Sequence, residues 1–243
     1  MKRREARNFY LYTAPWLIGF FVLTLYPIVY SFYLMFTDMN LTGVGKFIGL
    51  ENLKYAFTDD PLFIKAFINT LKYVVMFVPS SIILAFFVAL LLSKKVKGLG
   101  FFRTAFYIPY ITSGVAVTIL WGWIYQKDYG IINYVLSLFG IKGVNWLGDK
   151  NIAMISIVIL SLWTIGNNII IMLAGIQDIP QSYYESAQID GAGAIRQIFS
   201  ITLPLCTPTI YFNLIVTIIA AFQVFQQPLI LTNGGPLNST YTA

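Results

Sequence analysis

Five long stretches of this sequence contain no aspartate, glutamate, lysine or arginine, and each can cross a membrane as a helix. They are Asn8–Thr37, Tyr73–Leu92, Thr104–Gln126, Asn151–Gln177 and Gln197–Ala243. A spanning helix needs about 20 predominantly apolar residues. Backbone polar groups in lipid must be paired within their own segment, which favours helices, and the stretches lack the alternating pattern of barrel strands. The sequence therefore predicts an all-α, polytopic transmembrane helix bundle.

The composition agrees with a membrane protein and excludes several kinds of site. Only 11% of the 243 residues are charged, against about 25% in soluble domains. The first stretch is much longer than the core of a signal peptide, about 7–15 apolar residues, so we expect a retained span. Histidine is absent and Cys206 is the single cysteine, which excludes histidine ligands and a thiolate metal cluster. We expect no metal site and no catalytic residue.

Basic residues gather in connections that lie on one side of the predicted spans. If the N-terminus is cytoplasmic, so are the connections Met1–Arg7, Ser93–Arg103 and 178–196. They contain nine Lys and Arg residues, and the opposite connections contain seven. An excess of basic residues in short loops marks the cytoplasmic side of a membrane. This distribution explains the net charge of +6 better than a surface for nucleic acid does.

The fifth stretch predicts the end of the bundle. We expect its helix to begin after Pro204 and to end near Leu231, before the turn sequence 233–236, Asn-Gly-Gly-Pro. Five spans would leave the C-terminus outside, so we expect a truncated chain that lacks a sixth, returning helix. Because no internal repeat or linker is evident, residues 1–243 are expected to form a single transmembrane domain.

Residues 178–203 differ from the rest of the chain because charged and small side chains crowd there. Ser182 and Glu185 have the spacing of a capping box. We expect a helix over about 183–190, a left-handed stop at Gly191 and a second helix over about 194–202. Two interpretations remain open from the residues alone: an ordinary capped loop, or a surface that another protein approaches closely.

Polar side chains inside the predicted spans are the candidates for a substrate pathway. The fourth span carries Thr164, Asn167 and Asn168, and the fifth carries Asn213, Thr217, Phe222, Gln223, Phe225, Gln226 and Gln227. Polar groups at membrane depth usually face a cavity or another helix. Amides beside an aromatic ring suit a sugar, whereas contacts between helices contribute about 0.6 kcal/mol each on average. Both readings stay open, and we take Thr164, Asn167, Asn168, Phe222, Gln223 and Gln226 as the candidates.

The sequence from Tyr184 to Pro204, YESAQIDGAGAIRQIFSITLP, resembles the EAA motif of ABC importer permeases. The pattern of that motif is roughly E-A-A-x-x-D-G-A, followed by F-x-x-I-x-L-P. Residues on the pattern are Glu185, Ala187, Asp190, Gly191, Ala192, Phe199, Ile201, Leu203 and Pro204, and Ser186 replaces its first alanine. Stretches at 26–38, 47–57, 106–121 and 231–240 resemble the carbohydrate branch, whose known types include maltose and glycerol-3-phosphate importers. The resemblance covers nearly the whole chain.

The resemblance implies a permease subunit of the type I importer fold in a bacterial or archaeal cell (inner) membrane. Its 178–203 loop would dock on a cytoplasmic ATPase dimer, which binds ATP and Mg, so this subunit needs no cofactor of its own. The implied coupling residues are Glu185, Ser186, Ala187, Asp190, Gly191 and Ala192. A second permease subunit and an extracytoplasmic solute-binding protein are the other implied partners. Thr164 and Asn167 align with positions that line the sugar site in the family.

Three other functions fit the sequence less well: import of glycerol 3-phosphate or another polyol, ion-coupled transport, and catalysis within the membrane. No Lys or Arg lies in spans three to five, whereas a phosphorylated substrate favours a cation, so we expect a sugar or oligosaccharide rather than glycerol 3-phosphate or another polyol. An ion-coupled secondary transporter often has intramembrane acids or broken helices, and the sequence shows neither. An intramembrane enzyme would need catalytic groups at membrane depth. The sequence also lacks the phosphate loop G-x-x-x-x-G-K-[ST] of an ATPase.

Overall fold

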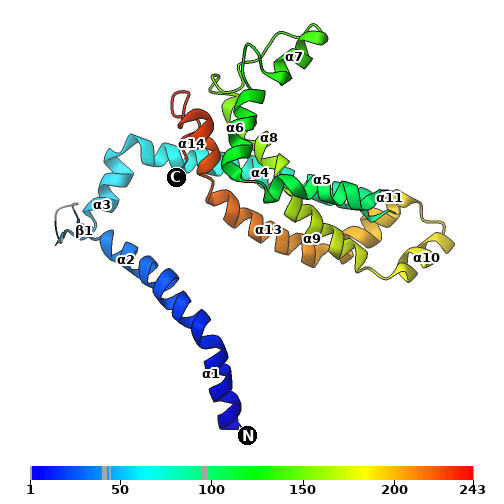
Figure 1. Ribbon diagram of the computed structural model, residues 1–243, viewed down its shortest axis with the longest axis horizontal. Coiled ribbons are helices and arrows are strands. Elements are labelled where there is room, and N and C mark those ends of the chain that lie inside the picture. The colour runs from blue at the N-terminus through cyan, green and yellow to red at the C-terminus, as the bar shows by residue number, and fades with distance from the viewer. Residues whose placement is uncertain (1, 40–42, 44, 95–97, 243) are drawn as a thin grey trace. The chain divides into compact units, whose positions relative to one another are not determined.

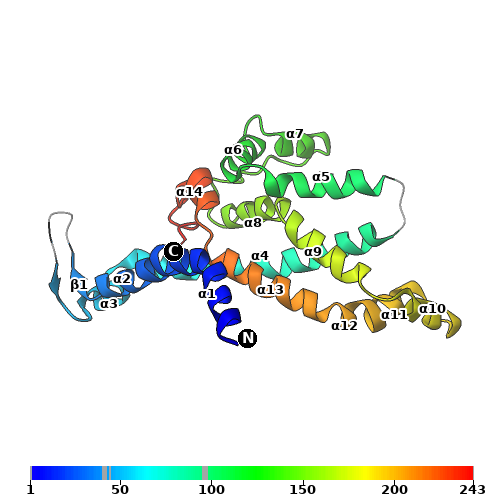
Figure 2. The same ribbon diagram turned by 60° about the horizontal axis from the view of Figure 1, so that its bottom comes forward.

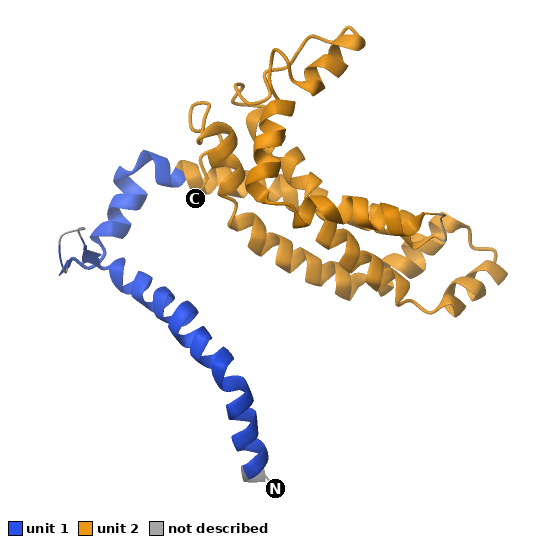
Figure 3. Ribbon diagram, in the orientation of Figure 1, with its two compact units in different colours: residues 1–64 blue, residues 65–243 orange. Residues whose placement is uncertain are grey.

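The computed structural model describes residues 2–39, 43, 45–94 and 98–242, and most of them are helical. Lys95 and Lys97, which we counted among the basic residues of the second cytoplasmic connection, lie outside the described residues. The chain divides into two compact units, residues 1–64 and 65–243, coloured separately in Figure 3. Each unit is described by itself below.

Unit 1 contains one long apolar helix followed by a small extramembrane segment. The helix runs through α1 (Lys2–Gly19), η1 (Phe20–Leu25) and α2 (Tyr26–Leu34), and the range Arg4–Leu34 is long and apolar enough to cross a membrane. The remaining elements are β1 (Thr37–Asp38), β2 (Lys46–Phe47), α3 (Glu51–Lys54) and η2 (Tyr55–Asp59). The two strands pair antiparallel. None of the most apolar part of the helix is buried, as expected for a surface that faces lipid or other helices.

Wider π-helical turns precede two prolines in the spans. The segment η1 ends two residues before Pro27, and η3 (Ile198–Thr202) ends two residues before Pro204. In each case the residue before the proline donates its N–H to the carbonyl five residues back, in place of four. A proline ring clashes with the carbonyl four residues before it. A π-turn moves that carbonyl, so the helix continues through the proline.

Unit 2 contains one straight span and three bent ones (Figures 1 and 2). The straight span is α4 (Pro61–Ser93). The bent pairs are α5 (Leu99–Ile111) with α6 (Gly114–Ile124) at 98°, α8 (Ala153–Trp163) with α9 (Gly166–Gln177) at 51°, and residues Ala194–Leu205 with α13 (Thr207–Phe222) at 65°. Counting each bent pair as one span gives up to five spans. The expected all-α transmembrane bundle is therefore confirmed.

The expectation that these spans are unbroken is wrong. The third stretch breaks at Thr112, which is extended. The fourth breaks at Thr164. The helix expected from Pro204 to Leu231 ends at Phe222, and the chain resumes as α14 (Gln226–Thr232). These residues fit a helix by composition, so the breaks follow from contacts between segments that are distant in the sequence.

One such contact is a close approach of α9 and α5 at Gly166. A Cβ atom at this position would collide with the backbone carbonyl of Phe106. Since a backbone atom cannot rotate away, only glycine lets α9 begin this close to α5. The break before Gly166 thus allows the second half of the fourth span to pack on α5.

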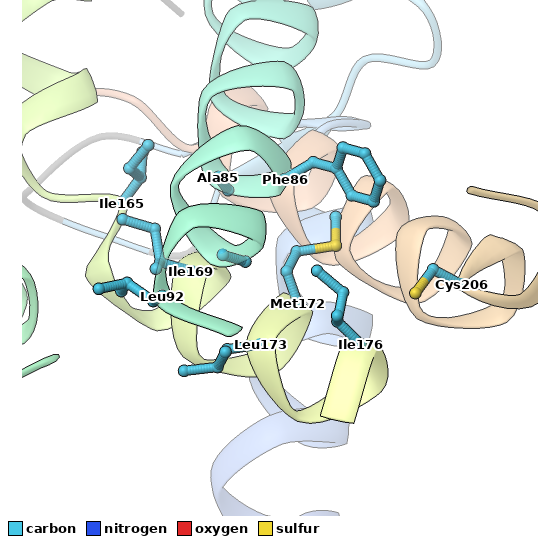
Figure 4. Close-up of a cluster of buried hydrophobic side chains, with 10 residues drawn as sticks. Ala85, Phe86, Leu92, Ile165, Ile169, Met172, Leu173, Ile176 and Cys206 are labelled. Atoms are coloured by element: carbon cyan, nitrogen blue, oxygen red, sulfur yellow. The ribbon is translucent and has the colours of Figure 1, made fainter. Parts of the chain in front are cut away.

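Two buried apolar clusters lie along α4. One joins α4 to α9 and to Cys206, as Figure 4 shows with Ala85 and Phe86 facing Met172. The other joins α4 to α8 and α13 through residues such as Val78 and Ile157. Tyr73 belongs to the second cluster, and its hydroxyl donates to the Ser161 Oγ at 2.9 Å. The single straight helix therefore packs against the fourth and fifth spans.

An extramembrane lobe follows α6 and contains α7 (Ile131–Leu138). Its centre is the buried side chain of Asn133. The Asn133 amide donates to the carbonyls of Lys127 and Val144, and its oxygen accepts from the Val144 N–H and the Trp146 indole, all at 2.8–3.0 Å. One fully bonded amide thus closes the loop on both sides of α7.

Candidate functional site

The 178–203 segment folds as two helical arms joined by a glycine turn at one end of unit 2 (Figure 2). The first arm is α10 (Gln181–Ile189). It ends at Gly191, whose φ is +75°, as expected for the predicted left-handed stop. The Gly191 N–H donates to the Gln188 carbonyl at 3.0 Å, and the Ala192 N–H donates to the Ala187 carbonyl at 2.8 Å. This pair of bonds is a Schellman motif, which satisfies the last carbonyls of the helix.

The predicted capping box at the start of this arm is wrong. The helix begins at Gln181, directly after Pro180, and no side chain caps it. Ser182 is therefore already helical, whereas a cap residue must have an extended backbone for its hydroxyl to reach the first free N–H groups. Glu185 is exposed and has no hydrogen bond or ion pair with any described residue. Its carboxylate is free for an external partner.

The second arm runs without interruption toward a span. It consists of α11 (Ala194–Gln197), η3 and α12 (Leu203–Leu205), and is longer than the expected 194–202. A bend at Cys206 then leads into α13. Pro204 lies within this arm, and Pro208 lies in the first turn of α13, where a proline is well tolerated.

Two side-chain hydrogen bonds hold the arms together. The Tyr184 and Thr202 hydroxyls are 2.9 Å apart. The Gln197 Nε2 donates to the Ala192 carbonyl at 2.8 Å. These bonds join α10 to η3 and α11 to the glycine turn, so they fix the two arms against each other.

The surface of this segment mixes charge with large apolar side chains. Ile189 is 87% exposed and Ile195 is 74% exposed. Phe199 and Tyr183 are also exposed, close in sequence to Glu185 and Arg196. Exposed apolar side chains surrounded by polar ones mark surfaces that bind another protein. Ile189 and Ile195 are not among the residues predicted from the sequence. Large apolar residues within a charged connection would have indicated them.

The polar residues of the fourth span lie at and just after its break. The Thr164 hydroxyl donates to the Ser161 carbonyl of its own helix at 2.9 Å. The Asn168 Nδ2 donates to the Thr217 Oγ1 at 2.9 Å and so joins α9 to α13. Asn167 is half-buried and forms no hydrogen bond with a described residue. Of the three, Asn167 alone presents an unused amide.

The candidates of the fifth span cluster around the break between α13 and α14. Phe222 is the last residue of α13, and Gln223 follows it. Both are exposed. Gln226 begins α14, and its amide lies beside Gly114 at the start of α6. None of these residues forms the Asn168–Thr217 contact, which lies earlier on α13.

One polar group that the sequence analysis did not select as a candidate is Asn213 on α13. Its side chain is 1% exposed, and its Nδ2 has no hydrogen-bond partner. An unpaired buried amide costs about 1–3 kcal/mol. Thr217, four residues later on the same helix, is also buried, but it accepts a hydrogen bond from Asn168.

The acidic residues and Cys206 do not gather into a metal site. Across the described ranges no group of three or more Cys, Asp or Glu residues could hold a metal ion.

Comparison with known proteins places the sequence among transport proteins. Residues 61–243 match the protein family described as binding-protein-dependent transport system inner membrane component. The sequence is 39% identical over 242 residues to the probable ABC transporter permease protein YesP of Bacillus subtilis, covering 98% of this chain and 78% of the relative. It is 34% identical over 242 residues to the trehalose/maltose transport system permease protein MalF of Thermococcus litoralis, covering 99% and 82%.

A solved structure has the same architecture. It is a bacterial alginate ABC transporter in complex with an alginate pentasaccharide-bound periplasmic protein. The TM-score is 0.78 and the sequence identity 25%, with 99% of this chain and 82% of that chain covered. The bent spans described above therefore occur in the fold of a transporter permease.

Proposed function

The chain belongs to the family of binding-protein-dependent transport system inner membrane components, and from this premise we propose that it moves a sugar or an oligosaccharide. It is a membrane-embedded permease subunit of an ABC importer and not an enzyme. Its relatives include permeases named for trehalose/maltose and for alginate, which supports a carbohydrate as the class of substrate. The broken helices, which would otherwise suit a secondary transporter, belong here to an importer permease.

The exposed surface of the 178–203 segment is the observation that supports a coupling role. We assign to it the docking of a cytoplasmic ATPase dimer, which binds ATP and Mg. The proposed coupling residues are Glu185, Ser186, Ala187, Asp190, Gly191 and Ala192. Glu185 supplies an unpaired charge. The neighbouring Ile189 side chain is 87% exposed and supplies apolar area. Charge gives such an interface its orientation and apolar area gives it affinity.

The hydrogen bonds of the segment suggest how it transmits movement. Tyr184 and Gln197 hold the two arms as one body, and the second arm continues to the bend at Cys206. When the ATPase subunits close, this body would tilt and change the bend before α13. Since α13 is joined to α9 by Asn168 and Thr217, the movement would reach the fourth span.

We place the substrate pathway at the two helix breaks. Asn167 and Gln223 have amides that no described residue uses, and Phe222 offers an exposed ring. Sugar hydroxyls bond to amides, while the apolar face of a sugar packs on an aromatic ring. Thr164 and Asn168 are bonded within the protein, so their proposed part is to hold the shape of the path. Gln226, beside Gly114, would close its outer end.

Importers of this family work with a solute-binding protein, as the complex with a periplasmic protein illustrates for the alginate transporter. The proposed assembly adds a second permease subunit and the ATPase dimer, with no nucleic acid. We place the N-terminus in the cytoplasm of a bacterial or archaeal cell, on the basis of the basic residues in the first two connections.

The test is substrate-stimulated ATP hydrolysis by the reconstituted importer. Purified complex with its binding protein is given a panel of neutral sugars, oligosaccharides and glycerol 3-phosphate. We expect stimulation by a carbohydrate, because residues 104–126, 151–177 and 197–243 contain no Lys or Arg to attract a phosphate. Stimulation by glycerol 3-phosphate alone would overturn the proposed substrate class.

The same assay tests the coupling role through Glu185→Lys. Because Glu185 is exposed and unpaired, its replacement should leave stability within about 0.5 kcal/mol, while substrate no longer stimulates ATP hydrolysis. Asp128→Lys, which makes the same charge change at an exposed aspartate outside the 178–203 segment, is the matched control and should retain stimulation. Full stimulation with Glu185→Lys would remove Glu185 from the docking surface.

A further inference from the structure

A pocket of about 530 Å³ lies at the end of unit 2 that is remote from α10, and three lysines line it. Lys65 and Lys72 lie two helical turns apart on one face of α4. Lys150 comes from the connection that leads into α8. Among the described residues that line the pocket, none is an aspartate or a glutamate. The lining therefore concentrates positive charge without a counterion.

Two of the three lysines are unpaired. Lys65 donates from its Nζ to the Leu237 carbonyl at 2.6 Å. Lys72 and Lys150 are exposed and form no hydrogen bond or ion pair within the described part of the chain. Three ammonium groups around one pocket repel each other, so a bound anion would stabilise the arrangement.

A buried hydroxyl adds a further donor to the pocket. The Ser239 Oγ is buried and has no hydrogen-bond partner, and Ser239 lines the pocket. Its loop is held against α4 by Asn69, whose Nδ2 donates to the carbonyls of Asn238 and Tyr241 at 2.8 and 2.9 Å. A buried polar atom without a partner marks a place for a water, an ion or a ligand. Lysines and a hydroxyl suit the several acceptor oxygens of a phosphate.

The remaining wall of the pocket is apolar. Met76 lies one helical turn beyond Lys72 along α4, within the uncharged stretch that begins at Tyr73. Met154 and Ile155 of α8 complete this wall. The lining thus changes from charged to apolar along the spans at the boundary of the membrane. This gradient matches a phospholipid, whose charged headgroup continues into an acyl chain, better than it matches a free anion.

We propose that this pocket binds the phosphate headgroup of an anionic phospholipid at the end of the spans opposite to the 178–203 segment. Basic pockets between transmembrane helices on the cytoplasmic side of membranes bind such headgroups, and the lining of this pocket offers the same chemistry at the opposite end. The site shares no residue with the coupling segment or the candidate substrate pathway. It would fix α4, the straight helix that packs against the fourth and fifth spans, relative to the bilayer.

The test uses the full-length chain within its assembled importer, in nanodiscs of phosphatidylcholine with increasing fractions of phosphatidylglycerol. We expect the midpoint of thermal unfolding of the wild type to rise with phosphatidylglycerol. In the variant with Lys72→Gln and Lys150→Gln, the fraction needed for half the rise should increase about thirtyfold, or the rise should vanish. Lys72→Arg with Lys150→Arg keeps both charges and should retain most of the rise.

The matched control removes two lysines that do not line the pocket, with Lys127→Gln and Lys142→Gln. An equal loss in the control variant would overturn the proposal, because general surface charge would then be responsible.

Soluble glycerol phosphate is added to phosphatidylcholine nanodiscs in a separate arm. If it stabilises the wild type as much as phosphatidylglycerol does, the lipid assignment is overturned in favour of a soluble phosphate. Should the glutamine variant fail to assemble, Ser239→Ala is expected to give a smaller loss, and no loss would contradict the site.

Discussion

At the scale of single residues, Gly191 has the clearest physical requirement in the coupling segment. Its φ is +75°, and a Cβ atom there would meet nothing within 4 Å. The cost of a side chain at this position is therefore backbone strain alone, about 1–2 kcal/mol, and not a collision. The strain would open the Schellman turn and so change the angle between the two arms.

Two substitutions of similar size should therefore give different outcomes. Gly191→Asn should retain most substrate uptake, because asparagine tolerates the left-handed conformation. Gly191→Leu should reduce uptake about tenfold, which is the population change that such strain produces. Uptake by vesicles that contain the assembled importer measures both. If Gly191→Leu transports normally, or if both variants fail equally, the left-handed conformation is not the reason for the glycine.

At the scale of helices, the close approach of α9 to α5 depends on Gly166. Gly166→Ala would place a Cβ atom against the Phe106 carbonyl, which can move only if a helix moves. We expect a loss of about 1–3 kcal/mol in stability, measured as a lower unfolding midpoint in detergent. Gly100→Ala on α5 is the matched control, because a Cβ atom there meets nothing within 4 Å, and it should be neutral or slightly stabilising. An unchanged midpoint with Gly166→Ala would show that α9 is free to shift.

The same scale shows what the sequence could and could not predict. The positions of the spans follow from the lack of charge, since lipid excludes charged side chains wherever the helix packs. The breaks at Thr112 and Thr164 do not follow, because both residues are compatible with a helix and contacts such as that of α9 with α5 at Gly166 are not visible in the sequence. The Gly191 stop could be predicted because its cause is local. The capping box at Ser182 could not be excluded, because the helix starts after Pro180, two residues earlier than predicted.

At the scale of the whole molecule, one candidate region could be predicted from the sequence and the other could not. The 178–203 segment could be found because charge and glycine stand out against apolar neighbours. Asn168 and Asn167 could not be told apart in the sequence, although one bonds Thr217 and the other is free. Which amide faces another helix depends on the rotation of α9 after its break. The substrate pathway is therefore the part of the molecule that sequence reasoning defines least.

The orientation of the molecule in the membrane can be tested with its own single cysteine removed. Cys206 is 1% exposed, so Cys206→Ser gives a background without thiols and with little change of surface. New cysteines are then introduced one at a time, by Ile189→Cys in the 178–203 segment and by Lys142→Cys in the lobe that contains α7. Both native side chains are exposed, so differences in labelling report the side of the membrane and not burial. A membrane-impermeant maleimide should label the Lys142→Cys protein in intact spheroplasts and the Ile189→Cys protein only in inverted vesicles. The reverse pattern would contradict the cytoplasmic N-terminus and, with it, the proposed contact between Glu185 and a cytoplasmic ATPase.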